Sequence, residues 1–270
     1  IDIHEQRGNA IKILGRVLWK ASRMQPCHLK SIKGGNKRNA IPREAEAEVM
    51  VLETAIDEVS KIVGDEAKKI AEELGGRETD LEVKIEAADD FSNRIMDEES
   101  QKKVLNLILA LPHGVEAMSY DIEGLVETSN NLATISTGGD EVVIGTSSRS
   151  SIASALQALR DRIRAVGELA GAEVEENEPY PGWKPNLSSE LLGIVKSVHQ
   201  REFGEEPELK AIHAGLECGI IGEKFPGMDM VSIGPWIEHP HSPEERVNIP
   251  SVMKFWKLLT AVLKEIAERK

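Results

Sequence analysis

The sequence predicts an α+β domain over residues 1–178, in which helices cover one face of a largely antiparallel sheet, followed by part of an α/β domain over residues 179–270. Helical stripes, alternating segments and hairpin-type turns predict the first region. Helix and strand patterns that alternate along the chain predict the second. Residues 175–182 are charged and then rich in Pro and Gly, which predicts the boundary between the two.

Four amphipathic helices are expected in the first region, because apolar residues recur there at three- and four-residue spacing. They lie within residues 10–18, 56–74, 104–111 and 152–170. Gly75 and Gly76 end the second helix, since glycine readily adopts the positive φ of a helix end. Pro112 closes the third, because proline cannot continue a helix.

Strands are expected where polar and apolar residues alternate or where β-branched residues are concentrated. These segments are residues 27–32, 49–52, 81–87, 125–136, 141–146 and 172–174. Glycine-containing turns at 33–36 and 137–140 predict hairpins, which join neighbouring antiparallel strands. The first region is therefore expected to contain a largely antiparallel sheet.

The second region shows a different order of elements. Its expected elements are a helix at 187–198, a strand at 209–213, a turn or helix from Gly215, a strand at 230–233 and a helix at 252–266. A parallel sheet needs helices on both faces, and these elements are too few to provide that cover. We therefore expect only part of an α/β layer here.

Composition excludes several classes of partner. The chain has 33 Lys and Arg against 46 Asp and Glu, and its formal charge of −13 disfavours binding to nucleic acid or anionic membranes. Two distant cysteines, Cys27 and Cys218, are typical of a reducing compartment, so a cytoplasmic location is expected. We expect neither a membrane span nor a signal peptide. The chain begins with Ile and not Met, so we expect it to derive from a longer protein.

The segment Glu238–Val247 carries two imidazoles and several carboxylates just after an expected strand. Loops at strand ends often collect metal ligands. On composition alone, a solvated loop with incidental histidines is the stronger interpretation. His239 and His241 have a spacing that allows joint chelation, but Pro240 between them restrains the backbone.

Several motifs in collinear order strengthen the metal interpretation. They are Asp2-Ile3-His4, Arg7-Gly8-Asn9-Ala10, Leu111-Pro112-His113-Gly114-Val115, Glu127-Thr128-Ser129-Asn130-Asn131, Ser148-Arg149-Ser150, Tyr180-Pro181-Gly182-Trp183, His213-Ala214-Gly215-Leu216-Glu217 and the His241-Ser242-Pro243 tripeptide. Together they resemble the aminoacyl-histidine dipeptidases, a family of two-zinc metallopeptidases. The resemblance covers essentially the whole chain, as a lid domain over 1–178 and the C-terminal part of the catalytic domain over 179–270.

The resemblance implies a homodimeric enzyme that hydrolyses Xaa-His and other dipeptides with two zinc ions. Most of the family's metal ligands lie in an H-x-D element, a bridging Asp, a Glu-Glu pair and a further Asp of the N-terminal half. This chain contains no H-x-D, and its adjacent glutamates fall in charged helical faces or loops. We therefore expect the chain alone to be inactive.

The resemblance also assigns roles to single residues. His241 matches the last metal ligand, whereas His239 departs from the family pattern and is expected to lie in the loop. Arg149 matches the arginine that binds the substrate carboxylate, for which a planar guanidinium is suited; a structural salt bridge is its alternative. Glu217 matches an acidic residue near the substrate's amino group, and a helix-start carboxylate is equally compatible with the sequence.

His4 and His113 are lid histidines, and in relatives such a residue stabilises the tetrahedral oxyanion from across the dimer. The sequence does not decide between them, and a surface turn is the alternative for His113. Asn131 is expected to donate to substrate, with a strand-end cap as its alternative. Two competing functions remain: a non-catalytic dimerisation or peptide-binding module derived from the lid, and a related aminopeptidase or deacylase.

Overall fold

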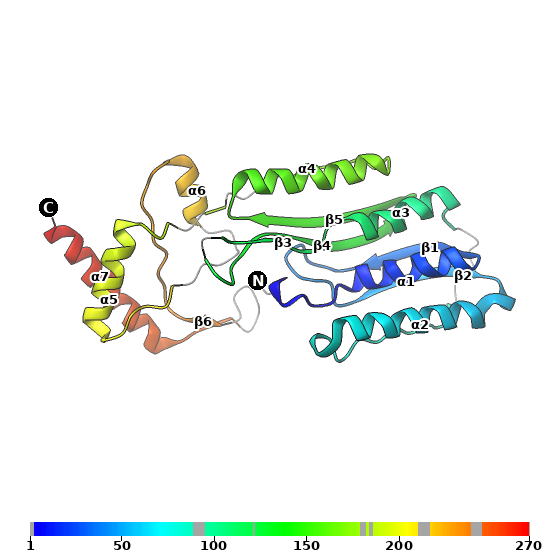
Figure 1. The fold of residues 1–270 in the computed structure, drawn as a ribbon, viewed down its shortest axis with the longest axis horizontal. Helices are drawn as coiled ribbons and strands as arrows, with labels where there is room; N and C mark the ends of the chain where they lie inside the picture. Colours follow the sequence, from blue (N-terminus) through cyan, green and yellow to red (C-terminus); the bar gives the residue numbers. More distant parts are fainter. Residues whose placement is uncertain are drawn as a thin grey trace. The chain divides into compact units, whose positions relative to one another are not determined.

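The computed structural model describes residues 3–88, 95–120, 122–178, 182–183, 186–209, 217–238 and 245–269. The chain divides into two compact units, Ile1–Glu178 and Pro179–Lys270 (Figure 1). The division falls within the charged and Pro-rich stretch noted in the sequence. Among the described residues, no helix combines the length and apolar character that crossing a membrane requires.

The first unit contains a five-stranded, wholly antiparallel sheet. Its strands are β1 (Cys27–Gly34), β2 (Ala45–Val51), β3 (Gly114–Met118), β4 (Val126–Gly138) and β5 (Glu141–Ser150). Strand β4 is the centre of the sheet: β5 pairs along one side of it, while β3 and β1 pair with its beginning and end on the other. Strand β2 extends the sheet beyond β1.

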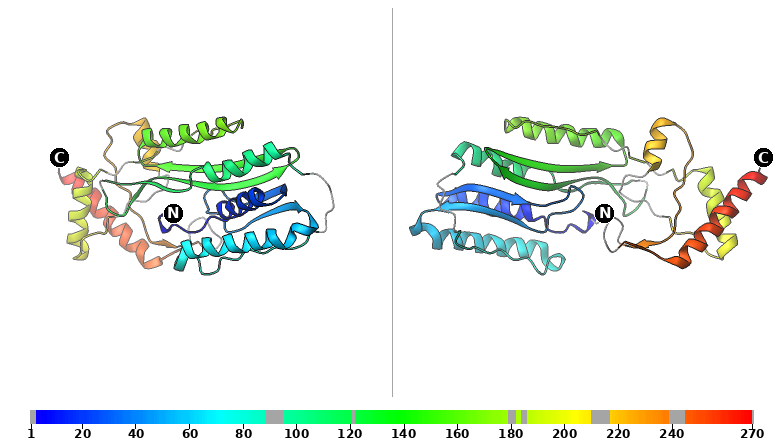
Figure 2. Two further views of the ribbon diagram at one scale, coloured as in Figure 1. Left: turned by 45° about the vertical axis from the view of Figure 1, so that its right-hand side comes forward. Right: turned by 180° about the vertical axis from the view of Figure 1, so that it is seen from behind.

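Four helices pack on one face of this sheet. They are α1 (Ala10–Met24), α2 (Ile56–Leu74), α3 (Glu98–Ala110) and α4 (Ala153–Leu169). Helix α1 lies in front of the strands in Figure 1 and behind them in the reversed view of Figure 2. The expected arrangement of helices over one face of a largely antiparallel sheet is therefore confirmed for this unit.

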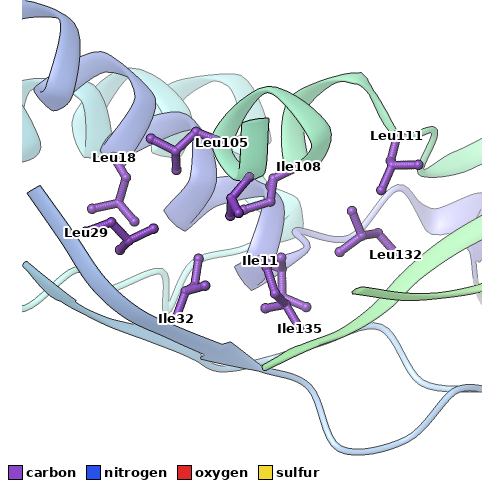
Figure 3. Close-up of a cluster of buried hydrophobic side chains, with 10 residues drawn as sticks. Ile11, Leu18, Leu29, Ile32, Leu105, Ile108, Leu111, Leu132 and Ile135 are labelled. Atoms are coloured by element: carbon purple, nitrogen blue, oxygen red, sulfur yellow. The ribbon is translucent and has the colours of Figure 1, made fainter. Parts of the chain in front are cut away.

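Apolar side chains from the strands and helices form the main core between these two layers (Figure 3). The cluster comprises Ile11, Leu18, Leu29, Ile32, Val104, Leu105, Ile108, Leu111, Leu132 and Ile135. Helices α1 and α3 approach closely because Gly15 faces Ile108: a Cβ at Gly15 would lie 2.3 Å from Ile108 Cγ2. The absence of a side chain at Gly15 thus sets the distance between the two helices.

Helices α1 and α2 are joined by an ion-pair cluster centred on Arg16. Its Nε donates to Glu66 Oε1 at 2.8 Å, and its two terminal nitrogens donate to the Glu73 oxygens at 2.6 and 2.8 Å. Glu66 is buried, so removal of Arg16 would leave a carboxylate with only the 3.4 Å contact to Lys69. The cluster therefore fixes α2 beside α1.

The second unit contains α5 (Glu190–Phe203), α6 (Glu217–Lys224), α7 (Ile249–Glu268) and a short antiparallel pair, β6 (Ile237–Glu238) with β7 (Arg246–Val247). Helices α5 and α7 pack together. Their buried core consists of Ile194, Val195, Val198, Leu258 and Val262.

The sequence was wrong about several strands. Residues 81–87, 172–174 and 230–233 have no strand structure, although Leu81 and Val83 pack against the α1–α2 core as alternating strand residues would. Alternation alone does not make a strand, because a strand also needs a neighbour for its backbone hydrogen bonds. Strand β3 was missed, and the strand expected at 209–213 falls mostly outside the described residues.

The close approach at Gly15 predicts that Gly→Ala substitution destabilises the protein there, although the same substitution stabilises it at an open helical position. Gly15→Ala should lower the free energy of unfolding by about 1–3 kcal/mol, because the new methyl group overpacks the α1–α3 contact. Gly64→Ala on α2 meets no atom within 4 Å and should instead raise it by roughly 0.5–1 kcal/mol through helix propensity. Urea unfolding of both variants measures the contrast, and stabilisation by Gly15→Ala would contradict the packing.

Candidate active site

Four of the residues expected to act on substrate lie around the first half of β4. Asn131 is on β4 itself, and Arg149 of β5 is paired with Ser129. His113 directly precedes Gly114, which pairs with Asn130. His4 lies in the short 3-10 helix Ile3–Glu5, which packs against β3 and β4. Residues separated by more than a hundred positions are thus brought to one region of the sheet.

Strand register places Asn131 and Arg149 on the same face of the sheet. Ser129 and Asn131 are two residues apart on β4 and are paired with Arg149 and Ser147. Side chains two apart on a strand share a face, and so do paired residues on adjacent strands. The opposite face carries the side-chain hydrogen bond from Ser148 Oγ to Asn130 Oδ1, 2.8 Å.

The carboxamide of Asn9 determines the chemical form of His113. Asn9 is the N-cap of α1: its Oδ1 accepts from the backbone N–H of Lys12 at 3.1 Å, and its Nδ2 donates to the carbonyl of Leu132 at 2.8 Å. These two partners fix which end of the amide is nitrogen. The same Nδ2 lies 3.3 Å from His113 Nδ1. His113 Nδ1 must therefore accept, and its hydrogen is on Nε2.

The surroundings of His113 also keep the ring neutral. Burial lowers the pKa of His113 to about 4, and the positive charge of Lys12 acts in the same direction. Lys12 is held beside it by hydrogen bonds from Nζ to the carbonyls of Ile108, Leu109 and Leu111, at 2.7, 2.9 and 2.5 Å. Burial lowers the pKa of Lys12 to about 8, so it remains mainly charged at neutral pH. A neutral imidazole with Nε2–H is a hydrogen-bond donor that carries no charge.

The side chain of Asn131 has one task within the described structure. Its Nδ2 donates to the carbonyl of Ala40 at 2.7 Å and to that of Arg38 at 3.5 Å, which ties the β1–β2 connection to the sheet. Its Oδ1 is buried and has no hydrogen-bond partner. Asn131 was expected to donate to substrate, but its donor is already occupied. The atom that remains for a ligand is an acceptor.

The other expected residues belong to the second part of the chain, residues 179–270. Glu217 is exposed and is the first residue of α6, in the second unit. His241 and its neighbour His239 fall outside the described residues. Within the described part of the chain, no three His, Cys, Asp or Glu side chains form a group that could hold a metal ion. The described residues therefore do not fit two zinc ions by themselves.

Sequence reasoning missed Asn9 and Lys12, which set the chemistry of His113. The available signal was a helix start: an Asn followed three residues later by the first basic residue of an amphipathic helix. That pattern predicts a cap, which Asn9 is. It does not predict that the cap and the helix also reach a histidine more than a hundred residues away.

Comparisons with known proteins identify the chain. A family model described as "Peptidase dimerisation domain" matches residues 1–78. The cytosol non-specific dipeptidase of Escherichia coli (strain K12) is 38% identical over 266 residues, which is 98% of this chain and 54% of that protein. The crystal structure of the aminoacylhistidine dipeptidase from Vibrio alginolyticus matches with a TM-score of 0.88 and 38% identity, covering 98% of this chain and 54% of that one.

This chain belongs to the family of aminoacylhistidine and cytosol non-specific dipeptidases. The resemblance found in the sequence motifs is thereby confirmed, and so is the mixed fold with a mostly antiparallel sheet. The chain spans about half the length of the dipeptidases that it matches.

The neutral state of His113 predicts a specific pH dependence of stability. The unfolded chain has an ordinary imidazole, so between about pH 6.5 and pH 4 it binds a proton that the folded chain does not. Stability should fall as the pH is lowered through this window, by up to about 3 kcal/mol from this residue. His113→Asn keeps an acceptor for Asn9 and cannot titrate, so its unfolding free energy should fall less.

Urea unfolding at pH 4, 5, 6 and 7 measures this difference between the two proteins. Nitrogen-15 NMR of the imidazole at pH 7 should show a protonated Nε2 and an unprotonated Nδ1. Equal pH dependence in both proteins, or a protonated Nδ1, would contradict the assigned network.

Proposed function

We propose that this chain forms part of a zinc-dependent dipeptidase that hydrolyses Xaa-His and other dipeptides. The observation that carries the proposal is the gathering of His113, Arg149 and Asn131 around one stretch of β4, in a chain related to dipeptidases over nearly its whole length. His4 is the second histidine of this region. The enzyme is proposed to be cytoplasmic and to act as a homodimer through residues 1–178, in keeping with the dimerisation-domain match.

Each residue of the first unit has a proposed task on the substrate. The Arg149 guanidinium binds the C-terminal carboxylate with two parallel hydrogen bonds. His113 Nε2–H, or His4 in its place, donates to the oxyanion that forms at the scissile carbonyl. A neutral imidazole suits this task because, unlike an imidazolium, it donates a hydrogen bond to the oxyanion without transferring its proton. Asn131 Oδ1 accepts a hydrogen bond from a substrate N–H.

In the second unit, Glu217 is proposed to bind the substrate's ammonium group, and His241 to ligate a metal. Two zinc ions would polarise the scissile carbonyl and lower the pKa of the attacking water. The single imidazole of His241 cannot hold two zinc ions, so the remaining ligands are proposed to come from polypeptide outside the 270 residues of this chain. For this reason, the 270-residue chain alone is proposed to be inactive.

A binding module derived from the same domain is the second candidate function. The match to a dimerisation domain favours it, and such a module needs no metal ligand. The coding sequence beside this chain offers a discriminating observation. The metallopeptidase hypothesis requires an H-x-D element and a Glu-Glu pair in the sequence encoded upstream of Ile1. Their absence would favour the binding module.

Metal content and hydrolysis test the enzymatic proposal. We expect the isolated chain to release no product from Xaa-His dipeptides. A fusion that adds the part of the E. coli dipeptidase outside the 266-residue match should bind two zinc ions and hydrolyse Xaa-His dipeptides. In that fusion, His241→Ala should lose one zinc ion and most turnover, whereas His239→Ala should keep both. Hydrolysis by the isolated chain, or equal zinc content in the two variants, would refute the assignment.

The role of Arg149 can be separated from a structural ion pair by the choice of substrate. In the same fusion, Arg149→Lys should lower kcat/KM for a dipeptide about 30-fold, because hydrogen bonds to a charged group contribute roughly 1.5–3 kcal/mol and lysine cannot form the bidentate pair. For the matching dipeptide amide, which lacks the carboxylate, the same substitution should change kcat/KM less than about twofold. An equal loss on both substrates would indicate a structural role.

A further inference from the structure

The connection between β1 and β2, residues 35–44, lies over the face of the sheet that is turned away from the helices. Leu132 belongs to the core under the helices, and neighbouring strand residues face opposite sides, so Asn131 points to the other face. Asn131 is nevertheless only 7% exposed. Its NH2 group donates to the carbonyls of Arg38 and Ala40, which places this connection over β4. We call residues 35–44 the strap.

Three further contacts hold the backbone of the strap in place. Gly35 has a φ of 68° and no room for a Cβ, which would clash with the carbonyl oxygen of Ala133 on β4. The N–H of Gly35 donates to the carbonyl of Glu44 at 3.3 Å and closes the base of the strap. The carbonyl of Pro42 accepts from the N–H of Ala10, at the start of α1, at 3.0 Å. Charged side chains on the strap therefore begin from fixed backbone positions.

The strap reverses the sign of charge that prevails in the protein. It contains Lys37, Arg38 and Arg43 against one acidic residue, Glu44, whereas the chain as a whole has a formal charge of −13. All three basic residues are exposed. Fixed charges of one sign beside a binding site attract ligands of the opposite sign and repel those of the same sign. The strap is thus suited to an anionic group.

The strap lies close to Arg149, the proposed partner of the substrate carboxylate. Arg149 pairs with Ser129, which is two residues from Asn131 on the same face of the sheet. From the rise per residue and the spacing between strands, the Cα atoms of Arg149 and Asn131 are roughly 8 Å apart. Asn131 in turn holds the carbonyl of Arg38 at 3.5 Å. The cations of the strap and Arg149 therefore occupy neighbouring positions over one part of the sheet.

We propose that the strap selects the charge of the C-terminal side chain of the dipeptide, with Lys37 and Arg38 as the specificity-determining residues. Because Arg149 binds the α-carboxylate, the side chain of the same substrate residue lies within about one Debye length of the strap. A carboxylate side chain, as in Xaa-Glu, is favoured over its neutral isostere, and the ammonium group of Xaa-Lys is disfavoured. This inference rests on the proposed function, which places the C-terminal residue at Arg149.

Two double variants with the same change in net charge isolate the effect of the strap. Lys37→Gln with Arg38→Gln removes two charges from the strap and keeps polar side chains. Lys61→Gln with Lys68→Gln removes two charges from exposed positions of α2, on the helical side of the sheet. All four residues are exposed, so both variants should fold, which circular dichroism and thermal unfolding verify.

The measurement compares substrates of nearly identical shape in the fusion with the remaining part of the E. coli dipeptidase. The ratio of kcat/KM for Gly-Glu to that for Gly-Gln should fall about threefold to sixfold in the strap variant at low ionic strength, since two charges act across roughly 8–10 Å of a water-like medium. The ratio for Gly-Lys to Gly-Gln should rise by a similar factor. The α2 variant should change either ratio less than about 1.5-fold.

Salt provides a second measurement on the unchanged fusion. In 1 M NaCl its Gly-Glu to Gly-Gln ratio should approach that of the strap variant, because the Debye length falls to about 3 Å. If the double strap variant fails to fold, Lys37→Gln alone should produce about half of the change in the logarithm of the ratio.

Hydrolysis with the same ratios in the unchanged fusion and the strap variant would refute the role of the strap alone. An equal shift in the α2 variant would also overturn it, since the preference would then follow net charge and not position. A fusion that hydrolyses none of these dipeptides would refute the proposed function and this inference with it.

Discussion

The first unit depends on how α1 is anchored at its start by the buried side chain of Asn9. One carboxamide caps the helix, bonds to the carbonyl of Leu132 at the centre of the sheet, and contacts His113. The next contacts follow at three-residue intervals: Lys12 binds the end of α3, and Gly15 permits the close approach of Ile108. Successive turns of one helix thus position the sheet, α3 and the histidine.

This anchoring explains why the candidate site has its particular electrostatic character. Partial burial and the nearby Lys12 ammonium group disfavour the cationic form of His113, and an amide donor at Nδ1 leaves the hydrogen on Nε2. The sequence motif identified His113 as a candidate but gave no information on its protonation. That information lies in contacts between residues 9, 12 and 113, which only the fold brings together. The same is true of Asn131, whose NH2 group donates to the carbonyls of Arg38 and Ala40.

The sequence predicted helices and hairpins far better than it predicted isolated strands. The helical stripes and the turns at 33–36 and 137–140 are local signals, and each led to the observed element. Strands depend in addition on a partner, which local sequence does not specify. Residues 81–87 and 230–233 have the right alternation but pair with no strand in the part of the chain that the structure describes. The short β3 gave no distinct pattern and forms because β4 is available beside it.

The described parts of the two units differ in how many helices and strands build their cores. In the first, the central strand is paired on both sides and the helices bury a continuous core, so Arg149 and His113 are held by a finished framework. In the described part of the second, Val231 and Ile233 pack against a core of one helix pair, and Glu217 begins a helix in which only Gly219 is buried. Catalytic geometry must be held within fractions of an ångström, and a paired central strand with a packed core meets this demand by fixing backbone positions.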